Sequence, residues 1–216
     1  MSPAIAPYWG VLVKGLMTTI WISWLALVLG GLMGAIVGTA RTSPWRVVRL
    51  CALVYTEVFR SIPPLLLIFG VFFGLKYMTG LDLSPFTAAT LALTVVASSF
   101  MSEVVRAGLM SVGRGQWDAA WSAGMRTRQI LRYIVWPQAI RVMLPPSVGV
   151  YIGTLKDSSL ASVIGYVELT KAGLLIRETT GVSFEVFLIV AALYFTINYG
   201  ISCGGAALER KFHFVH

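Results

Sequence analysis

The chain has 216 residues, of which 57% are hydrophobic and only 12% are charged, and its mean hydropathy is +0.79. A water-soluble domain carries about 25% charged residues, and so few polar side chains could not cover the apolar surface of a chain of this size. The composition therefore excludes an ordinary soluble domain and predicts a membrane protein.

Three stretches without a charged residue are long enough to cross a bilayer: 15–40, 83–102 and 186–208. Each reaches the roughly 20 residues that a helix needs to cross about 30 Å of hydrocarbon. Two further spans are interrupted: one starts after Arg49 and is centred on 62–75, and the other covers 142–155 with some flanking sequence. Prolines in them are tolerated where neighbouring helices satisfy the freed carbonyls. We therefore predict a single all-α polytopic domain, residues 1–216, with five transmembrane helices.

The distribution of positive charge orients these spans. Twelve of the 17 lysine and arginine residues fall on one side, mainly in the loops 41–49 and 107–141. The positive-inside rule makes this side the cytoplasm, which places the amino terminus outside and the carboxyl terminus inside. The same rule accounts for the net charge of +8 without nucleic acid. Residues 1–8 lack the pattern of a cleaved signal peptide, so we expect the first span to be retained.

The first span carries a glycine face. Gly30, Gly34 and Gly38 recur every four residues, which gives one flat side for close contact with another helix. Packing within the chain is favoured over a dimer contact.

Two acid–x–x–arginine pairs follow at the cytoplasmic boundary, Glu57 with Arg60 and Glu103 with Arg106. Residues three apart share one face of a helix, so each pair is placed to form an ion pair. Two interpretations stay open: a packed belt of charges that joins helices, or simple boundary salt bridges.

The longest cytoplasmic loop carries an apolar stripe. Trp117, Trp121 and Met125 are four residues apart, which predicts a short amphipathic helix. Asp118 is expected in its first turn, where an acid complements the helix dipole. Gly124 stands where a left-handed residue would end this helix.

A second short helix is predicted to follow, with Thr127 as its cap and Arg128 and Arg132 on its polar side. Its apolar side is formed by Ile130, Leu131, Ile134 and Val135. Pro137 is expected to turn the chain back into the membrane. Two short helices across a membrane face would form a compact knob, suited to fit a groove on another protein.

Residues 113–137 resemble the "EAA" signature of ABC importer permeases, in the acid–Ala–Ala at Asp118, in the glycine at 124 and in the hydrophobic–x–x–Pro close. Stretches beginning at Glu57, Ser102, Gly115, Pro137 and Leu155 resemble one branch, the polar amino acid uptake permeases of histidine, glutamine and glutamate systems. Two departures are Asp118 for the usual Glu, which is one methylene shorter, and Ser158 for a frequent Thr.

The resemblance implies a type I importer fold in the bacterial inner membrane. It implies two permease subunits, identical or siblings, with an ATPase dimer below and a soluble amino-acid-binding protein outside. The knob would be the coupling helix that docks the ATPase, through Trp117, Asp118, Ala119, Ala120, Trp121, Gly124 and Met125. No phosphate-binding loop of the G-x-x-x-x-G-K-[ST] type is present, so ATP and magnesium would bind the partner ATPase and this chain would be no enzyme and hold no cofactor.

An amino acid as cargo would need polar groups within the membrane. The 15 residues from Arg141 to Lys156 span about 22 Å of helix, which places the polar run that follows in the outer half. We expect Lys156, Asp157, Ser158 and Ser159 to line the path or its outer gate. Alternatively, Lys156 and Asp157 merely pair at the end of the fourth span. Beyond it, Gly165 and Gly173 indicate a short helical or re-entrant stretch on the outer side.

Two rival classes compete with this interpretation. A secondary transporter or channel-type subunit would need no ATPase partner, and it leaves the two-helix loop without a purpose. An intramembrane enzyme would need a base or a metal in the membrane, but His213 and His216 are both in the terminal tail. Cys51 and Cys203 are far apart and are expected to be small packing residues, neither a disulfide nor a metal pair.

Overall fold

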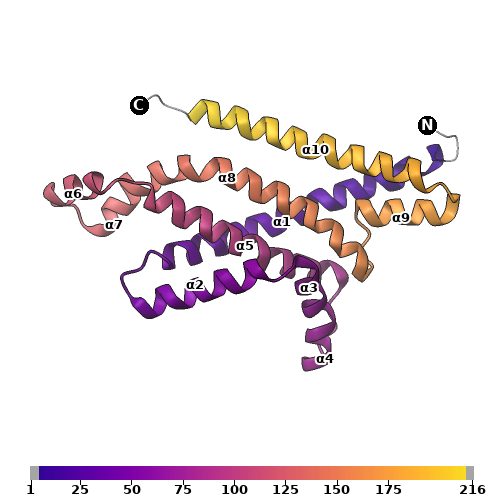
Figure 1. Ribbon diagram of the computed structural model, residues 1–216, viewed down its shortest axis with the longest axis horizontal. Coiled ribbons are helices and arrows are strands. Elements are labelled where there is room, and N and C mark those ends of the chain that lie inside the picture. Colours follow the sequence, from indigo (N-terminus) through magenta and orange to yellow (C-terminus); the bar gives the residue numbers. More distant parts are fainter. Residues whose placement is uncertain (1–4, 213–216) are drawn as a thin grey trace.

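The computed structural model describes residues 5–212, and within that range every regular element is helical (Figure 1). The elements are η1 (Ala6–Tyr8), α1 (Trp9–Ala40), α2 (Arg46–Ser61), α3 (Pro64–Phe69), η2 (Gly70–Gly74), α4 (Leu75–Thr79), α5 (Pro85–Met110), α6 (Arg114–Ser122), α7 (Thr127–Ile130), η3 (Leu131–Val135), α8 (Trp136–Asp157), η4 (Ser158–Ile164), α9 (Leu169–Thr180) and α10 (Ser183–Phe212). Of the short elements, η1 and η4 are 3₁₀ helices, whereas η2 and η3 are π turns. The predicted all-α fold is confirmed.

Three helices are long and apolar enough to cross a membrane unaided: α1, α5 and α10. They contain most of the three uncharged stretches. Two bent pairs of helices bring the number of spans to five if each pair is counted as one span. The pairs are α2 with the segment from α3 to α4, bent by 102°, and the segment 127–164 with α9, bent by 47°. The described structure therefore agrees with the prediction of five spans.

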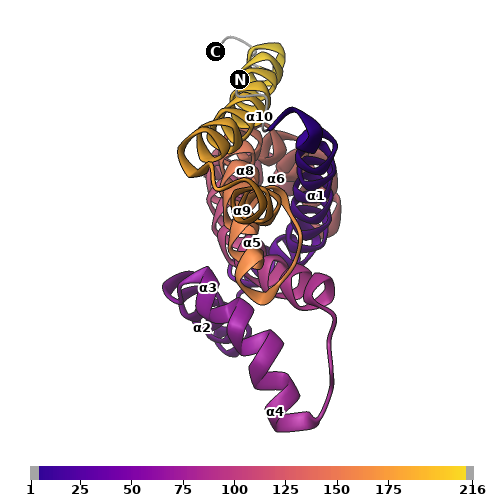
Figure 2. The same ribbon diagram turned by 90° about the vertical axis from the view of Figure 1, so that its right-hand side faces the viewer.

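Pro63 and Pro64 produce the sharper bend. Ile62 has extended backbone angles (φ −83°, ψ 128°), because the residue before a proline is kept out of the helical region. The chain leaves α2 there, and α3 and α4 project sideways from the bundle (Figures 1 and 2). The second predicted span, centred on 62–75, thus corresponds to a bent pair of helices, of which α2 is the part that runs along the other helices.

Pro137 does not turn the chain. It is the second residue of α8, and residues 127–164 form one uninterrupted helical stretch. The π turn η3 ends directly before α8, and its wider turn accommodates a ring that would clash with the carbonyl one turn earlier. The turn expected at Pro137 is wrong, and the fourth span continues through Pro145 and Pro146 to the end of α8.

The glycine face of α1 packs against α5, which confirms packing within the chain. A Cβ atom on Gly34 would lie 2.6 Å from the Cβ of Met101, and one on Gly38 would lie 2.5 Å from the carbonyl oxygen of Ser102. Only glycine allows two backbones to approach so closely. Helix α5 is consequently the centre of the bundle: 67% of its most apolar window is buried, against 28% for α1 and 11% for α10.

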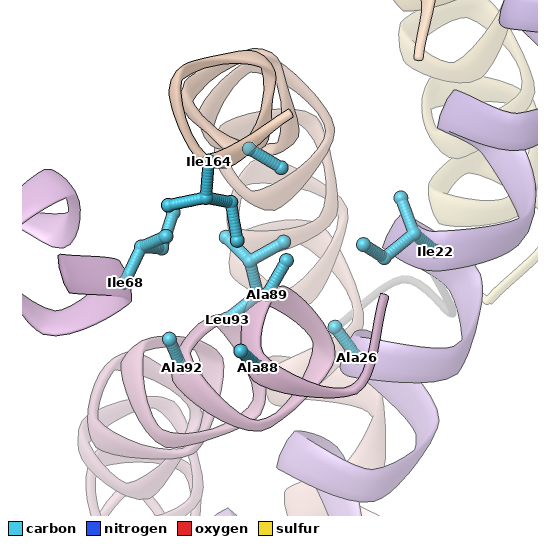
Figure 3. Close-up of a cluster of buried hydrophobic side chains, with 9 residues drawn as sticks. Ile22, Ala26, Ile68, Ala88, Ala89, Ala92, Leu93 and Ile164 are labelled. Carbon is cyan, nitrogen blue, oxygen red and sulfur yellow. The ribbon is translucent and has the colours of Figure 1, made fainter. Parts of the chain in front are cut away.

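A cluster of small and branched side chains closes the outer half of the bundle (Figure 3). Its larger members are Ile22 of α1, Leu93 of α5, Ile68 of α3 and Ile164 of η4. Alanines 88, 89 and 92 of α5 let these larger side chains come together. The cluster ties the sideways arm to the bundle at its first turn.

The expected helical stretch on the outer side is α9. Gly165, with φ +85°, ends η4, and the buried Glu168 then caps α9 by accepting hydrogen bonds from the N–H groups of Thr170 and Lys171, both at 2.8 Å. The hydroxyl of Tyr194 in α10 donates to the same carboxylate at 2.8 Å. One buried acid thus joins α9 to α10.

The surface around the circumference of the bundle is apolar, as lipid contact requires. Large side chains such as Ile36 (72% exposed) and Phe195 (68%) stand on it. Cys51 and Cys203 are free thiols on the same exposed surface, so the packing role expected for them is wrong.

The two ends of the bundle differ in charge. By the positive-inside rule, the end that carries α6, α7 and the start of α2 is cytoplasmic, and the end that carries α9 and the start of α1 is outside (Figure 1). Helix α10 leads back to the cytoplasmic end (Figure 1).

We expect Gly34→Ala to lower the unfolding temperature of the protein in detergent, because the added methyl group would overlap Met101 and overpacking costs about 1–3 kcal/mol. Gly31→Ala is the matched control: nothing lies within 4 Å of its added Cβ, so it should be neutral or slightly stabilising. Equal unfolding temperatures for the two variants would contradict the contact.

Candidate functional site

The 113–137 loop begins with two short helices joined through a left-handed glycine. Gly124 has φ +76°, and its N–H donates to the carbonyl of Trp121 at 2.9 Å. The N–H of Met125 donates to the carbonyl of Ala120 at 3.1 Å, which completes the usual six-residue end of a helix. The terminating role predicted for Gly124 is confirmed.

Two details of this loop differ from expectation. Helix α6 starts at Arg114, with the extended Gly113 before it, so Asp118 lies in the second turn and its predicted place in the first turn is wrong. Thr127 is the first residue of α7 and not its cap. The cap position belongs to Arg126, whose N–H donates to Oε1 of Gln129 at 2.8 Å.

One side of α6 is turned inward. Ala120 is buried, and Trp117 and Met125 are half-buried against a core at the cytoplasmic end. That core contains Ile130 and Val135 of the loop, Val105, Leu109 and Val112 of α5 and its following turn, and Ala139 and Met143 of α8. The apolar side predicted for the second helix is thus confirmed, and these contacts fix the loop to α5 and α8.

Other residues of α6 are exposed. They are Asp118, Ala119 and Trp121, and Trp121 is 53% exposed although its ring lies 5.8 Å from the ring of Trp117. The predicted stripe therefore divides: Trp117 and Met125 hold the loop in place, whereas Trp121 and its exposed neighbours form a free surface.

Charged side chains join three helices just above this core. Glu103 of α5 forms ion pairs with Arg41 at the end of α1 and with Arg106, and Arg60 of α2 lies 3.9 Å from it. Arg41 also lies 3.8 Å from Glu57 and is itself buried. The pair Glu103–Arg106 is confirmed, but Glu57 and Arg60 each bind a partner on another helix. Of the two interpretations, the packed belt is the one observed.

Arg41 is the residue that sequence reasoning missed in this belt, because the charge pattern identifies it only as a loop charge. The signal that could have identified Arg41 is its position directly after a helix with a glycine face. That face packs against α5 and so brings the end of α1 close to Glu103. Two hydroxyl pairs hold α2 in the same place: Tyr55 with Ser98 at 2.5 Å and Thr56 with Ser102 at 2.9 Å.

A cavity of about 410 Å³ lies between α2, α5 and α8, and we call it the central cavity. Its polar lining is Arg60, Glu103, Thr154 and Asp157. Its apolar lining is Val96, Phe100, Val104, Pro146 and Val150, and Gly149 and Gly153 open it because they have no side chains. Along α8 it extends from Pro146 to Asp157, about 16 Å at 1.5 Å per residue.

Of the four predicted path residues, only Asp157 lines the central cavity. Lys156 is exposed, and Ser158 and Ser159 donate to the carbonyls of Leu155 and Lys156 within their own turn. Arg60 and Glu103, predicted only as boundary charges, line the cavity as well. The structure thus brings together one carboxylate from the predicted path and two charges from the predicted belt.

Within residues 5–212, no group of three or more histidine, cysteine, aspartate or glutamate side chains is placed to hold a metal ion. His213 and His216 lie outside the described residues.

The comparisons with known proteins agree on one family. Residues 26–213 match the family described as "Binding-protein-dependent transport system inner membrane component". A probable glutamine ABC transporter permease protein, GlnP of Bacillus subtilis (strain 168), is 38% identical over 91% of both chains. The glutamine transport system permease protein GlnP of Escherichia coli (strain K12) is 33% identical and covers 96% of this chain and 95% of its own.

The structural comparison gives the same picture. A chain from the crystal structure of an amino acid ABC transporter with histidines superimposes with a TM-score of 0.90 and 34% identity, covering 96% of both chains. A chain of the inward-facing MetNI methionine ABC transporter superimposes with a TM-score of 0.83 at 23% identity, which speaks for the fold alone.

Proposed function

The chain belongs to the family of binding-protein-dependent transport system inner membrane components, and from this premise we propose that its cargo is a polar amino acid. As a member of that family it is the permease subunit of an ABC importer, a multi-pass inner-membrane protein that is not itself catalytic. Its relatives are named for glutamine and for L-cystine. A secondary transporter or channel subunit that works without an ATPase does not fit this family.

The observation that carries the coupling role is the core that the 113–137 loop shares with α5 and α8, two of the three helices that line the central cavity. Ala120, Ile130 and Val135 of the loop pack with Val105 of α5 and Met143 of α8. Close-packed cores transmit displacement and do not absorb it. A force on the exposed side of α6 would therefore move α5 and α8, whose adjoining residues line the cavity.

We assign the docking of the ATPase to the exposed side of α6. Asp118, Ala119 and Trp121 are free in the described chain to meet a partner, and a tryptophan beside a charge is a frequent centre of binding energy in interfaces. Trp117, Ala120, Gly124 and Met125 then shape and fasten the helix.

We assign the passage of the amino acid to the central cavity. An amino acid carries a negative carboxylate and a positive ammonium group. The lining of the cavity offers Arg60 to bind the carboxylate and Glu103 or Asp157 to bind the ammonium group. Phe100 and Val150 give apolar contact to the rest of the molecule. The cavity is lined by three helices of one chain, so a second permease subunit, identical or a sibling, would complete the passage.

The remaining partners follow from the family. A binding-protein-dependent ABC system includes an ATPase and a soluble binding protein. We place ATP and magnesium on the ATPase dimer, because this chain has no phosphate-binding loop. The chain itself would then need no cofactor, only the lipid bilayer and its protein partners, and no nucleic acid.

Asp118→Arg and Trp121→Ala should each lower the affinity of the permease for the ATPase by about 30-fold or more, since central interface residues contribute about 2 kcal/mol of binding free energy. The tagged permease is purified in detergent together with its ATPase, and the complex is diluted in steps. The measurement is the amount of ATPase that stays bound to the permease at each dilution. Glu178→Arg is the matched control, because it makes the same kind of charge reversal at an exposed site on α9, at the outer end. An unchanged complex with both α6 variants would refute the docking surface.

Gly153→Leu should abolish uptake while the complex still assembles. Nothing lies within 4 Å of a Cβ at this position, so the fold tolerates the side chain, but the side chain would occupy the central cavity. Uptake of labelled glutamine, histidine and cystine into proteoliposomes is the readout, with a loss of at least about tenfold expected. Gly204→Leu on α10 is the control, because it too has nothing within 4 Å and lies outside the lining. Equal uptake by both variants would remove the passage from this cavity.

Asp157→Asn should lower uptake much more than Lys156→Ala, because the structure places only Asp157 in the cavity lining. The aspartate-to-asparagine change keeps shape and removes charge, so a loss reports on electrostatics. Both variants are compared at equal amounts of assembled complex. Normal uptake by Asp157→Asn would leave this carboxylate as a structural feature of α8.

A further inference from the structure

A second cavity, of about 530 Å³, lies against the first half of α2 at the cytoplasmic end of the bundle, whereas the central cavity meets α2 only at Arg60, near its other end. Its polar lining consists of four arginines, Arg41, Arg46, Arg49 and Arg106. Its apolar lining is Leu50, Leu53 and Met110. We call it the basic pocket, and neither the docking surface nor the passage makes use of it.

The positive charge of the basic pocket is not fully compensated. Arg41 and Arg106 share Glu103 with Arg60, and Arg41 also meets Glu57, so both carboxylates at this boundary are already engaged. Within residues 5–212, Arg46 and Arg49 form no ion pair, and the guanidinium group of Arg49 meets only the carbonyl oxygen of Ser43 at 3.5 Å. Two exposed guanidinium groups are therefore free to bind an anion.

The start of α2 adds to this preference for an anion. Arg46 and Arg49 lie in the first turn of a 16-residue helix, and no side chain caps that turn. The N–H groups of a first helical turn have no partner within the helix and carry partial positive charge. The two arginines that line the cavity therefore also stand at the start of a helix.

The apolar lining says what kind of anion fits. Leu50 is 60% exposed, Met110 is 66% exposed, and Val47 and Val54 continue the same apolar surface along α2. Trp45, 73% exposed, precedes Arg46 directly, and tryptophan is enriched at the headgroup level of membranes. A site that joins arginines to an exposed apolar surface suits a molecule with a phosphate and acyl chains.

We propose that the basic pocket binds the phosphodiester headgroup of an anionic phospholipid of the cytoplasmic leaflet. Arg46 and Arg49 would bind the phosphate oxygens, and the acyl chains would lie along Leu50, Leu53 and the exposed valines of α2. Its volume is within the range of about 300–1,000 Å³ that is usual for small-molecule sites. The site is independent of the proposed cargo, because it requires only the chain and a membrane.

The test titrates the purified transporter in detergent with phosphatidylglycerol and, separately, with phosphatidylcholine of the same chain length, and counts bound lipid by native mass spectrometry. We expect saturable binding of phosphatidylglycerol that the double variant Arg46→Gln/Arg49→Gln weakens about 30-fold, since each arginine near a membrane surface contributes a factor of about five. Both arginines are exposed and lie outside the ion-pair belt, so the double variant should fold.

The matched control is Arg128→Gln/Arg132→Gln, which removes two exposed arginines from the same membrane side outside the pocket. It should leave phosphatidylglycerol binding unchanged. Equal binding by both double variants, or equal binding of the two lipids, would overturn the proposal.

Two further arms distinguish the lipid from other anions that could occupy the pocket. Glycerol 3-phosphate is the first: displacement of the lipid at equal concentration would show a site for free phosphate, and the lipid proposal would be wrong. The second adds further ATPase, in excess, to the purified transporter. Loss of lipid binding there would show that the pocket is a surface for a protein, which would also overturn the proposal.

Discussion

Close contact between the glycine face of α1 and the backbone of α5 is the constraint on which the rest of the structure depends. Lipid tails give no hydrophobic force for helix association, so contact area and close approach must hold the helices together. Surrounding α5 with α1, α2 and α8 removes it from the lipid. For this reason α5 can carry Ser98, Ser99 and Ser102 fully buried, and the hydroxyls of Ser98 and Ser102 in turn hold α2. The order of packing thus decides where polar groups are allowed.

The ion-pair belt follows from the same contact. A carboxylate at the edge of the hydrocarbon is costly unless it is paired and hydrogen-bonded. The glycine face delivers Arg41 to Glu103, and the hydroxyl pairs deliver Arg60 from α2. Three arginines around one glutamate fasten the cytoplasmic ends of three helices, and they leave that end with a surplus of positive charge, as the positive-inside rule describes.

Sequence reasoning succeeded where a local pattern decides the outcome. Uncharged length located α1, α5 and α10, the spacing of Gly34 and its neighbours identified a packing face, and Gly124 was identified as a helix end. It failed where tertiary contact decides. Spacing alone paired Glu57 with Arg60, but in the folded chain Glu57 pairs with Arg41, at the end of another helix. The Pro63–Pro64 bend shows the same limit. Its existence could be expected from the residues, whereas the sideways course of α3 and α4 depends on Ile68, which packs in a buried cluster with residues of α1, α5 and η4.

The belt also lies between the two cavities. Glu103 and Arg60 line the central cavity, while Arg41 and Arg106, bound to the same glutamate, line the basic pocket. The carboxylate of Glu103 is shared by three arginines. A new anion beside Arg41 and Arg106 would therefore weaken their ion pairs with Glu103, and the ion pair between Glu103 and Arg60 would become relatively stronger. The electrostatic state of the passage would then respond to the charge of the surrounding leaflet. This response needs no movement of the backbone, because the three guanidinium groups already converge on one glutamate.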